Sequence, residues 1–223
     1  MNQESTGARA RLTTPRAAAL AGILFSVLLI ISLVLIRVSV PPDPRDSGDW
    51  LTSSGRTVTL ALNLVPFAGI AFLWFIGVIR DRLGEYEDKL FATVFLGSGL
   101  LFLAMLFASA ATAAGVIMAA EVVGAGATAG GVYSFGRAAT YVALNTYAMR
   151  MAGVFMISAC TMFARTGVMP RWMAWLGYAL ALILLLSISS FSWVALLFPA
   201  WVFAVSVYIL IENFQPRVAP GVA

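Results

Sequence analysis

Six long apolar runs, separated by short polar segments, dominate the sequence. A helix needs about 20 mostly apolar residues to cross a hydrocarbon core of roughly 30 Å, and each run is close to or above that length. The pattern therefore predicts an all-α fold, a polytopic membrane helix bundle with six transmembrane helices. Their expected ranges are about 17–37, 57–79, 90–120, 138–163, 171–188 and 192–211.

The division between the last two runs rests on a short polar stretch. Residues 172–211 form an almost uninterrupted apolar sequence, and only the serine-rich segment 187–192 favours a turn. Because about 40 residues are twice what one span requires, two helices joined by a tight hairpin fit this stretch better than one helix does.

Composition supports a membrane protein and bears on how the chain begins. Hydrophobic residues make up 61% of the chain and charged residues 11%, whereas soluble domains have about 45–50% and about 25%. The first run follows Arg9, Arg11 and Arg16, as a secretory signal would. It is nevertheless as long as a full span and meets Arg37 without a small-residue cleavage pattern, so we expect a retained first helix.

The basic residues predict the orientation of the bundle. With the N-terminus in the cytoplasm, cytoplasmic segments collect nine arginines and lysines and outer segments collect four. The nine are Arg9, Arg11, Arg16, Arg80, Arg82, Lys89, Arg165, Arg171 and Arg217; the four are Arg37, Arg45, Arg56 and Arg137. This bias favours a cytoplasmic N-terminus, and six spans return the C-terminus to the cytoplasm. The expected parts are therefore a tail over 1–16, a membrane domain over 17–211 and a tail over 212–223.

Two further features refine the predicted bundle. Trp50, Trp172, Trp175 and Trp193 fall near span ends, where an indole ring is stable at the headgroup level. The third run is longer than a bilayer requires, so we expect its helix to project beyond the outer surface. Small residues in helical register favour a place for this helix at the bundle centre. They are Ala104, Ala108, Ala111, Thr112, Gly115 and Ala119.

Several kinds of chemistry are excluded by residues that the chain lacks. There is no histidine, so histidine-dependent zinc sites, bis-histidine haems and Ser-His dyads are excluded. Lys89 lies at a span boundary, and Cys160 has no second cysteine to pair with. The basic residues cluster at span ends, so they are topology signals and not a nucleic-acid surface. We expect no catalytic residue, metal or cofactor; the aspartates over 43–49 are typical of a solvated loop.

Arg150 is the only charged residue well inside an apolar run, and charges within a membrane are functional candidates. The alternative is that its long side chain reaches the outer headgroups. Polar residues at similar depth predict an outward-facing pocket in which Arg150 binds an anionic group, with Glu121 or Arg137 near the mouth. The candidate ligand-binding residues are Arg150, Asn145, Tyr141, Tyr147, Asn63 and Glu121, with Pro66 and Pro199 nearby.

The six-span layout and two span boundaries resemble uncharacterised bacterial membrane proteins grouped as domains of unknown function. The boundaries are residues 72–82 (FLWFIGVIRDR) and 169–177 (MPRWMAWLG). The preference for arginine over lysine, with abundant alanine, glycine and valine, is similar to proteins of high-GC actinobacteria. The resemblance implies a multi-pass protein of the plasma membrane and supplies no activity.

Three functions stay open at the level of sequence. The first is a non-enzymatic membrane component that assembles with or regulates others, because small-residue surface is abundant and no catalytic constellation is visible. The second is a transporter, channel or ligand-binding protein that uses the pocket around Arg150. The third and weakest is a lipid-modifying enzyme. The expected partners are the lipid bilayer and either further copies of the chain or other membrane proteins.

Overall fold

The computed structural model describes residues 3–43, 46–83, 89–124, 131–167, 169–186 and 193–214, and it describes side chains in 17–43, 46–80, 90–124, 131–167, 169–186 and 193–212. In these ranges every regular element is helical. The helices are α1 (Gln3–Ser39), α2 (Trp50–Ser53), α3 (Gly55–Leu83), α4 (Lys89–Val123), α5 (Gly131–Val142), the π-helix η2 (Ala143–Ala148), α6 (Met149–Thr166), α7 (Arg171–Leu186), the 3-10 turn η3 (Val194–Leu196) and α8 (Leu197–Phe214).

Five helical segments are long and apolar enough to cross a membrane. They are Ala17–Ser39, Gly55–Arg80, Leu90–Val123, Gly131–Thr166 and Val194–Glu212. The chain is therefore a multi-pass helical membrane protein. The remaining predicted span corresponds to α7, an apolar helix of 16 residues, which at 1.5 Å per residue is about 24 Å long.

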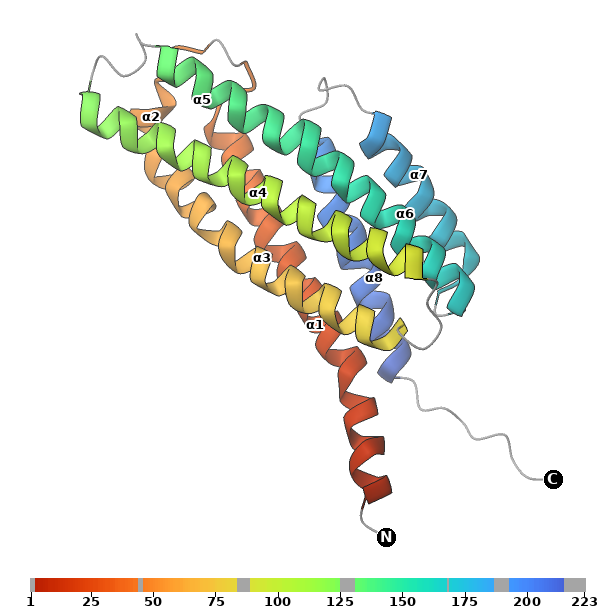
Figure 1. Cartoon of the computed structure of the whole chain (residues 1–223). Helices are drawn as coiled ribbons and strands as arrows, with labels where there is room; N and C mark the ends of the chain where they lie inside the picture. Colours follow the sequence, from red (N-terminus) through yellow and green to blue (C-terminus); the bar gives the residue numbers. More distant parts are fainter. Residues whose placement is uncertain are drawn as a thin grey trace, which may run out of the picture.

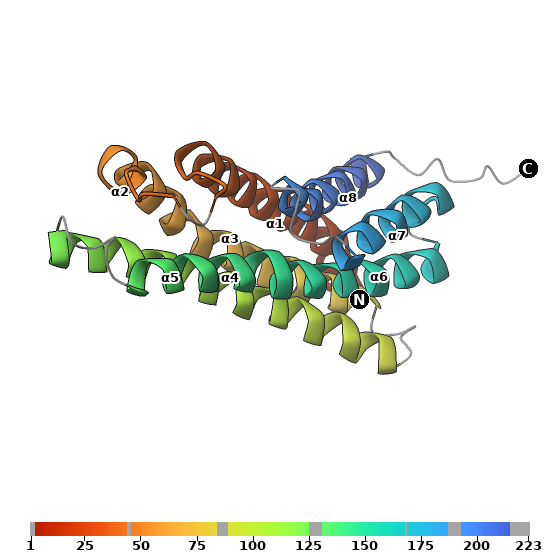
Figure 2. The ribbon, with the colours of Figure 1, turned by 90° about the horizontal axis from the view of Figure 1, so that it is seen from above.

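The long helices lie side by side and alternate in direction, as Figure 1 shows. Helix α1 packs against α3 and α8, and α4 packs against α3, α5 and α6. The segment Gly131–Thr166 forms one rod through α5, η2 and α6, so the helix predicted to begin at 138 begins seven residues earlier. The predicted turn at 187–192 lies outside the described residues. Seen from above, α2 lies at one end of the bundle, beside the ends of α3 and α4, and we call this the α2 end (Figure 2).

Phenylalanine rings from five helices fill the interior of the bundle. Six of them form what we call the phenylalanine core: Phe25, Phe72, Phe95, Phe102, Phe155 and Phe198. Phe72 is fully buried, and its ring centroid lies 4.5 Å from that of Phe25, 5.2 Å from that of Phe155 and 5.4 Å from that of Phe102. These tilted and edge-to-face contacts, with that between Phe72 and Phe198 at 5.6 Å, hold α1, α3, α4, α6 and α8 together.

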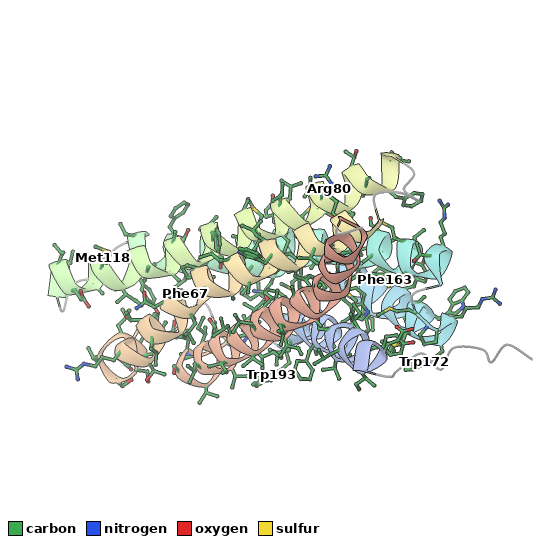
Figure 3. All side chains as sticks on the ribbon, turned by 90° about the horizontal axis from the view of Figure 1, so that it is seen from below. Phe67, Arg80, Met118, Phe163, Trp172 and Trp193 are labelled. Carbon is green, nitrogen blue, oxygen red and sulfur yellow. The ribbon has the colours of Figure 1, made fainter. Side chains whose placement is uncertain are left out.

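Large apolar side chains also cover the outside of the bundle. Phe67 is 62% exposed and Met118 is 66% exposed, and both project from the outer surface (Figure 3). A soluble protein rarely exposes so much continuous apolar surface, whereas hydrocarbon chains solvate it well. This distribution follows from the apolar runs in the sequence.

Small residues allow close helix contact in α1, as their spacing indicates. Ala18, Gly22 and Ser26 are all buried, and a Cβ atom at Gly22 would meet Ser206 of α8 and the ring of Phe75. The stripe on α4 behaves differently, because Ala104, Ala108, Ala111 and Gly115 are exposed. The predicted central position of α4 is wrong. Only 33% of the residues in its most apolar 18-residue stretch are buried, against 61% of those in the corresponding stretch of Gly131–Thr166.

Candidate functional site

The structure separates the six residues that the sequence suggested as a ligand pocket. Arg150, Tyr147, Asn63 and Glu121 have exposed side chains on the outer surface of the bundle. Asn145 and Tyr141 are half-buried, one helical turn apart, at the junction of α5 and η2. The predicted polar pocket thus has two of its members near one another and four at the surface.

Asn145 contacts an arginine that was not among the candidates. Arg37, in the last turn of α1, donates a hydrogen bond from Nη2 to the Asn145 side-chain oxygen at 3.3 Å. The amide nitrogen of Asn145 donates to the Tyr141 carbonyl at 3.1 Å. Asn145 lies within the π-helix η2, and a π-helical turn is an uncommon, locally widened conformation that often marks functional sites.

The two prolines that were expected near the pocket have different structural roles. Pro66 lies inside α3, where it removes one backbone hydrogen bond. Pro199 is the third residue of α8, where the backbone N–H would have no helical acceptor in any case. Pro199 therefore frees no carbonyl, and only Pro66 interrupts the hydrogen bonding of its helix.

A cavity of about 640 Å³, including the part open at its mouth, lies towards the α2 end among α1, α3, α4 and α5. Its walls come from residues 29–40, 58–65, 106–116 and 137–144, with Trp50 of α2. The cavity separates the phenylalanine core from a second buried cluster, which we call the cap cluster. The cap cluster consists of Trp50, Val58, Leu62, Val116, Ile117 and Tyr133.

The walls of the cavity are apolar over most of their surface. Ser32 and Ser109 also line it, but both hydroxyls already donate to backbone carbonyls. Ser32 donates to the Ala61 carbonyl at 2.8 Å, and Ser109 donates to the Thr140 carbonyl at 3.0 Å. The cavity wall therefore offers an apolar surface, which binds hydrocarbon better than it binds water.

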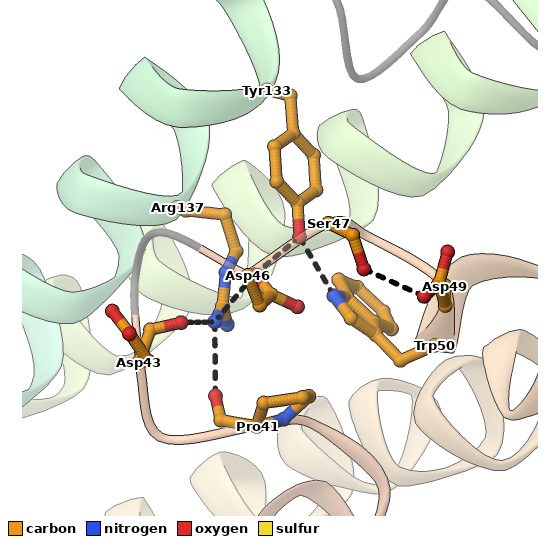
Figure 4. Close-up of polar contacts among 8 residues, drawn as sticks. All are labelled: Pro41, Asp43, Asp46, Ser47, Asp49, Trp50, Tyr133 and Arg137. Atoms are coloured by element: carbon orange, nitrogen blue, oxygen red, sulfur yellow. Dashed lines mark hydrogen bonds and ion pairs between the residues drawn. The ribbon is translucent and has the colours of Figure 1, made fainter.

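A polar network, which we call the polar cap, lies above the cavity and joins α2, α5 and the 40–49 segment (Figure 4). Its members are Asp46, Trp50, Tyr133 and Arg137. Trp50 donates from Nε1 to the Tyr133 hydroxyl at 2.9 Å, and Tyr133 donates to Asp46 Oδ1 at 2.7 Å. Trp50 is only 6% exposed, so the ring predicted to sit at the headgroups is instead part of the protein interior.

Arg137 connects the cap to the chain that leaves α1. Its Nη2 donates to the carbonyl oxygens of Pro41 at 2.9 Å and Asp43 at 3.0 Å, and it forms an ion pair with Asp46 Oδ1 at 3.3 Å. The guanidinium also lies 5.8 Å from the Trp50 ring centroid, within the range of a cation–π contact. Arg137 thereby ties Pro41, Asp43 and Asp46 to α5.

Three buried polar atoms in or beside this cap have no hydrogen-bond partner in the part of the chain that the structure describes. They are Arg137 Nε, Asp46 Oδ2 and Thr140 Oγ1. Arg137 and Thr140 also line the cavity. Buried polar groups are nearly always paired in folded proteins, because an unpaired one costs about 1–3 kcal/mol. All three atoms are themselves buried, so each carries this desolvation cost within the protein interior beside the cavity.

Sequence reasoning named Arg137 only as a residue near the mouth of the Arg150 pocket and missed this site, although a signal for it was present. Tyr133, Arg137, Thr140 and Leu144 follow one another at helical spacing and share one face of the α5–η2 rod. The predicted span began only at 138, so Tyr133 was left out of the helix. The contacts with Asp46 and Trp50 join residues about 90 positions apart, which no local pattern reveals.

Within the described residues, no group of three or more potential metal ligands gathers. Comparison with protein-family models, curated proteins and solved structures gave no match. No activity or site residue is therefore carried over from another protein, and the functional argument rests on the cavity and its polar cap.

Proposed function

We propose that this protein is a ligand-binding membrane protein that takes up an apolar chain from the bilayer into the cavity at the α2 end. The observation that carries the proposal is a cavity with largely apolar walls between two separately packed clusters. Ligand sites are typically concave and mostly apolar, with a few polar groups at defined positions. Trp50 and Arg137 of the polar cap also line the cavity.

The packing of the bundle favours binding over conduction. The phenylalanine core fills the interior between the cavity and the opposite end of the bundle, with Phe25, Phe72 and Phe155 fully buried. A chain inserted from the α2 end would meet these rings and stop. We therefore propose a receptor or carrier role for the cavity in preference to a channel.

Filling the cavity is expected to prevent chain binding. Ala110 and Ala113 of α4 line the cavity, and replacing Ala110 with leucine places a larger side chain in the space that a ligand would occupy. A photoreactive diazirine alkane without a polar head should label Leu33, Val65 or Leu106 in the parent protein and not in the Ala110→Leu variant. Mapping the labelled residues by mass spectrometry measures this difference.

The neighbouring residue provides a matched control. Ala111 is exposed on the outer face of the same helix, so Ala111→Leu adds the same volume outside the cavity and should leave the labelling of these three residues unchanged. Ala113→Leu serves as a second filling variant should Ala110→Leu fold poorly. Unchanged labelling of all three residues in both filling variants would contradict the proposal.

The membrane arrangement that we propose has six spans, both termini in the cytoplasm, and a location in a bacterial plasma membrane. The six spans and the shared side of the termini are supported by two features: α7 runs antiparallel to α6, and α8 ends at the end of the bundle where α1 begins (Figure 1).

In a Cys160→Ser background, single cysteines at Ser134 and Trp193 should react with an impermeant maleimide from outside whole cells. A cysteine at Glu212 should react only after lysis. Labelling of the Trp193 position only after lysis would show that α7 does not cross.

A second candidate function is assembly with other membrane components. The observation that favours it is the exposed stripe of small residues on α4, formed by Ala104, Ala108, Ala111 and Gly115. Such stripes allow two membrane helices to approach closely. If α4 mediates self-association, Ala108→Leu should lower the oligomeric mass of the protein in mild detergent. A mass that is the same in parent and variant removes the support for this role of the stripe.

A further inference from the structure

We infer that the ligand is an anionic amphiphile of the bilayer, with its carboxylate or phosphate head at Arg37 and one apolar chain in the cavity. This inference rests on the proposed function and adds the chemical class of the ligand. It depends on the charge of Arg37, which has no carboxylate partner among the described residues, and on the position of Arg37 at the edge of the cavity wall.

The guanidinium of Arg37 has a neutral partner. Arg37 is half-buried in the last turn of α1. Within the described residues it makes one hydrogen bond, from Nη2 to the Asn145 side-chain oxygen at 3.3 Å, and no ion pair. A bond from a guanidinium to an oxyanion is usually shorter, about 2.7–2.9 Å, and often uses two N–H groups at once. The contact with Asn145 therefore leaves most of the hydrogen-bonding capacity of Arg37 unused.

The charges around Arg37 do not neutralise it. The guanidinium of Arg137 is close enough to repel that of Arg37, and the Asp46 carboxylate is already paired with Arg137 at 3.3 Å. The segments 44–45, 125–130 and 187–192, which lie outside the described residues, contain no aspartate or glutamate. Arg37 would therefore attract an anionic head and repel a cationic one.

Arg37 is accessible at the level of the lipid headgroups. None of its nitrogen atoms is both buried and without a partner, so the donors that Asn145 does not engage lie at an accessible surface. Arg37 is two residues from the end of the apolar segment Ala17–Ser39, which places it at the boundary of the hydrocarbon region. The carboxylates and phosphates of anionic lipids lie at this boundary.

The cavity begins beside Arg37. Ile36 lines the cavity from α1, and the side chain of Arg37 is displaced from that of Ile36 by about 100° around the helix. Its partner Asn145 follows Leu144, which lines the cavity from η2. From Ile36 the wall of α1 continues to Leu29, about 10 Å away at 1.5 Å per residue. A head at Arg37 therefore places its chain along this wall, pointing towards the bundle centre.

Probes that share one chain and differ in the head test this inference. We would measure equilibrium binding of laurate, lauryl phosphate, lauryl alcohol and laurylammonium to the purified protein in phosphatidylcholine nanodiscs, at a pH where the charged probes are ionised. Laurate and lauryl phosphate are expected to bind about tenfold more tightly than the alcohol, and laurylammonium no more tightly than the alcohol. Equimolar acetate, which has the head without the chain, should not displace laurate.

Variants of Arg37 should change this preference. In Arg37→Gln, laurate binding should weaken about tenfold and match alcohol binding, whereas Arg37→Lys keeps the charge and should still favour laurate over the alcohol. Arg56 is exposed on α3 and does not line the cavity, so Arg56→Gln removes the same charge elsewhere and should leave laurate binding unchanged. The head-free diazirine alkane should label the parent and Arg37→Gln equally, which shows that the variant keeps its cavity.

The outcomes distinguish this inference from the proposed function. Equal binding of laurate and the alcohol, preference for laurylammonium, displacement by acetate, or an equal loss in Arg37→Gln and Arg56→Gln would overturn the assignment of an anionic head to Arg37. If the alkane still labels the cavity and Ala110→Leu still prevents that labelling, the proposed chain-binding function survives. Absence of binding by every probe, including the alkane, overturns both.

Discussion

Replacing Phe72 with alanine is expected to destabilise the folded bundle by about 3 kcal/mol, near the lower end of the range for deleting a buried phenylalanine ring in soluble proteins. Phe72 is fully buried and its ring contacts those of Phe25, Phe102, Phe155 and Phe198. In a bilayer the hydrocarbon also solvates an exposed ring, so the loss comes mainly from broken packing contacts. The unfolding midpoint in detergent should fall by roughly 10 °C.

The control for this prediction lies on the same helix. Phe67 is 62% exposed on the outer surface of α3, so Phe67→Ala removes an equal ring from a position without core contacts. Its midpoint should stay within about 2 °C of the parent, as is usual for surface substitutions. Equal midpoints for the two variants would show that the phenylalanine core does not hold the bundle together.

Replacing Arg137 with methionine is expected to cost about 3 kcal/mol and to open the polar cap. The substitution leaves the Asp46 carboxylate, only 9% exposed on its side chain, without its ion pair, and loss of one member of a buried pair typically costs 3–5 kcal/mol. It also removes the donors to Pro41 and Asp43. The midpoint should fall by roughly 10 °C, and the Asp46 amide, which donates to the Asp43 carbonyl at 3.3 Å, should exchange its hydrogen faster.

Arg150 supplies the matched comparison for Arg137. Its side chain is exposed on α6, so Arg150→Met should change the midpoint little and leave exchange of the Asp46 amide unchanged. The Arg137→Met, Asp46→Asn double variant should be more stable than the Arg137→Met variant, because it removes the unpaired charge. A double variant that is no more stable than the single one would mean that the ion pair contributes little.

The sequence predicted the helices well because crossing a bilayer imposes a length and a composition on each one. Runs of about 20 apolar residues were sufficient to locate the five long helices and α7. Helix ends were located less well where polar residues continue a helix. Gly131, Tyr133 and Arg137 belong to α5 although the apolar run begins after them.

The candidate site was harder to predict, because charge within an apolar run was the main signal available. That signal selected Arg150, whose long side chain lies on the exposed surface of the bundle. Arg137 lies at the edge of its run and was assigned to an outer segment, although its partners Asp46 and Trp50 come from a loop and a short helix far away in sequence. Long-range pairing of this kind depends on the folded chain.

The separation of the cap cluster from the phenylalanine core gives the protein two units of different local stability. The cap cluster has six buried members, and one side of it borders the cavity, so opening it breaks few contacts. The phenylalanine core draws on five helices and should open only when the whole bundle unfolds. Local opening of the cap cluster would therefore change the size of the cavity, while the rest of the bundle keeps its shape.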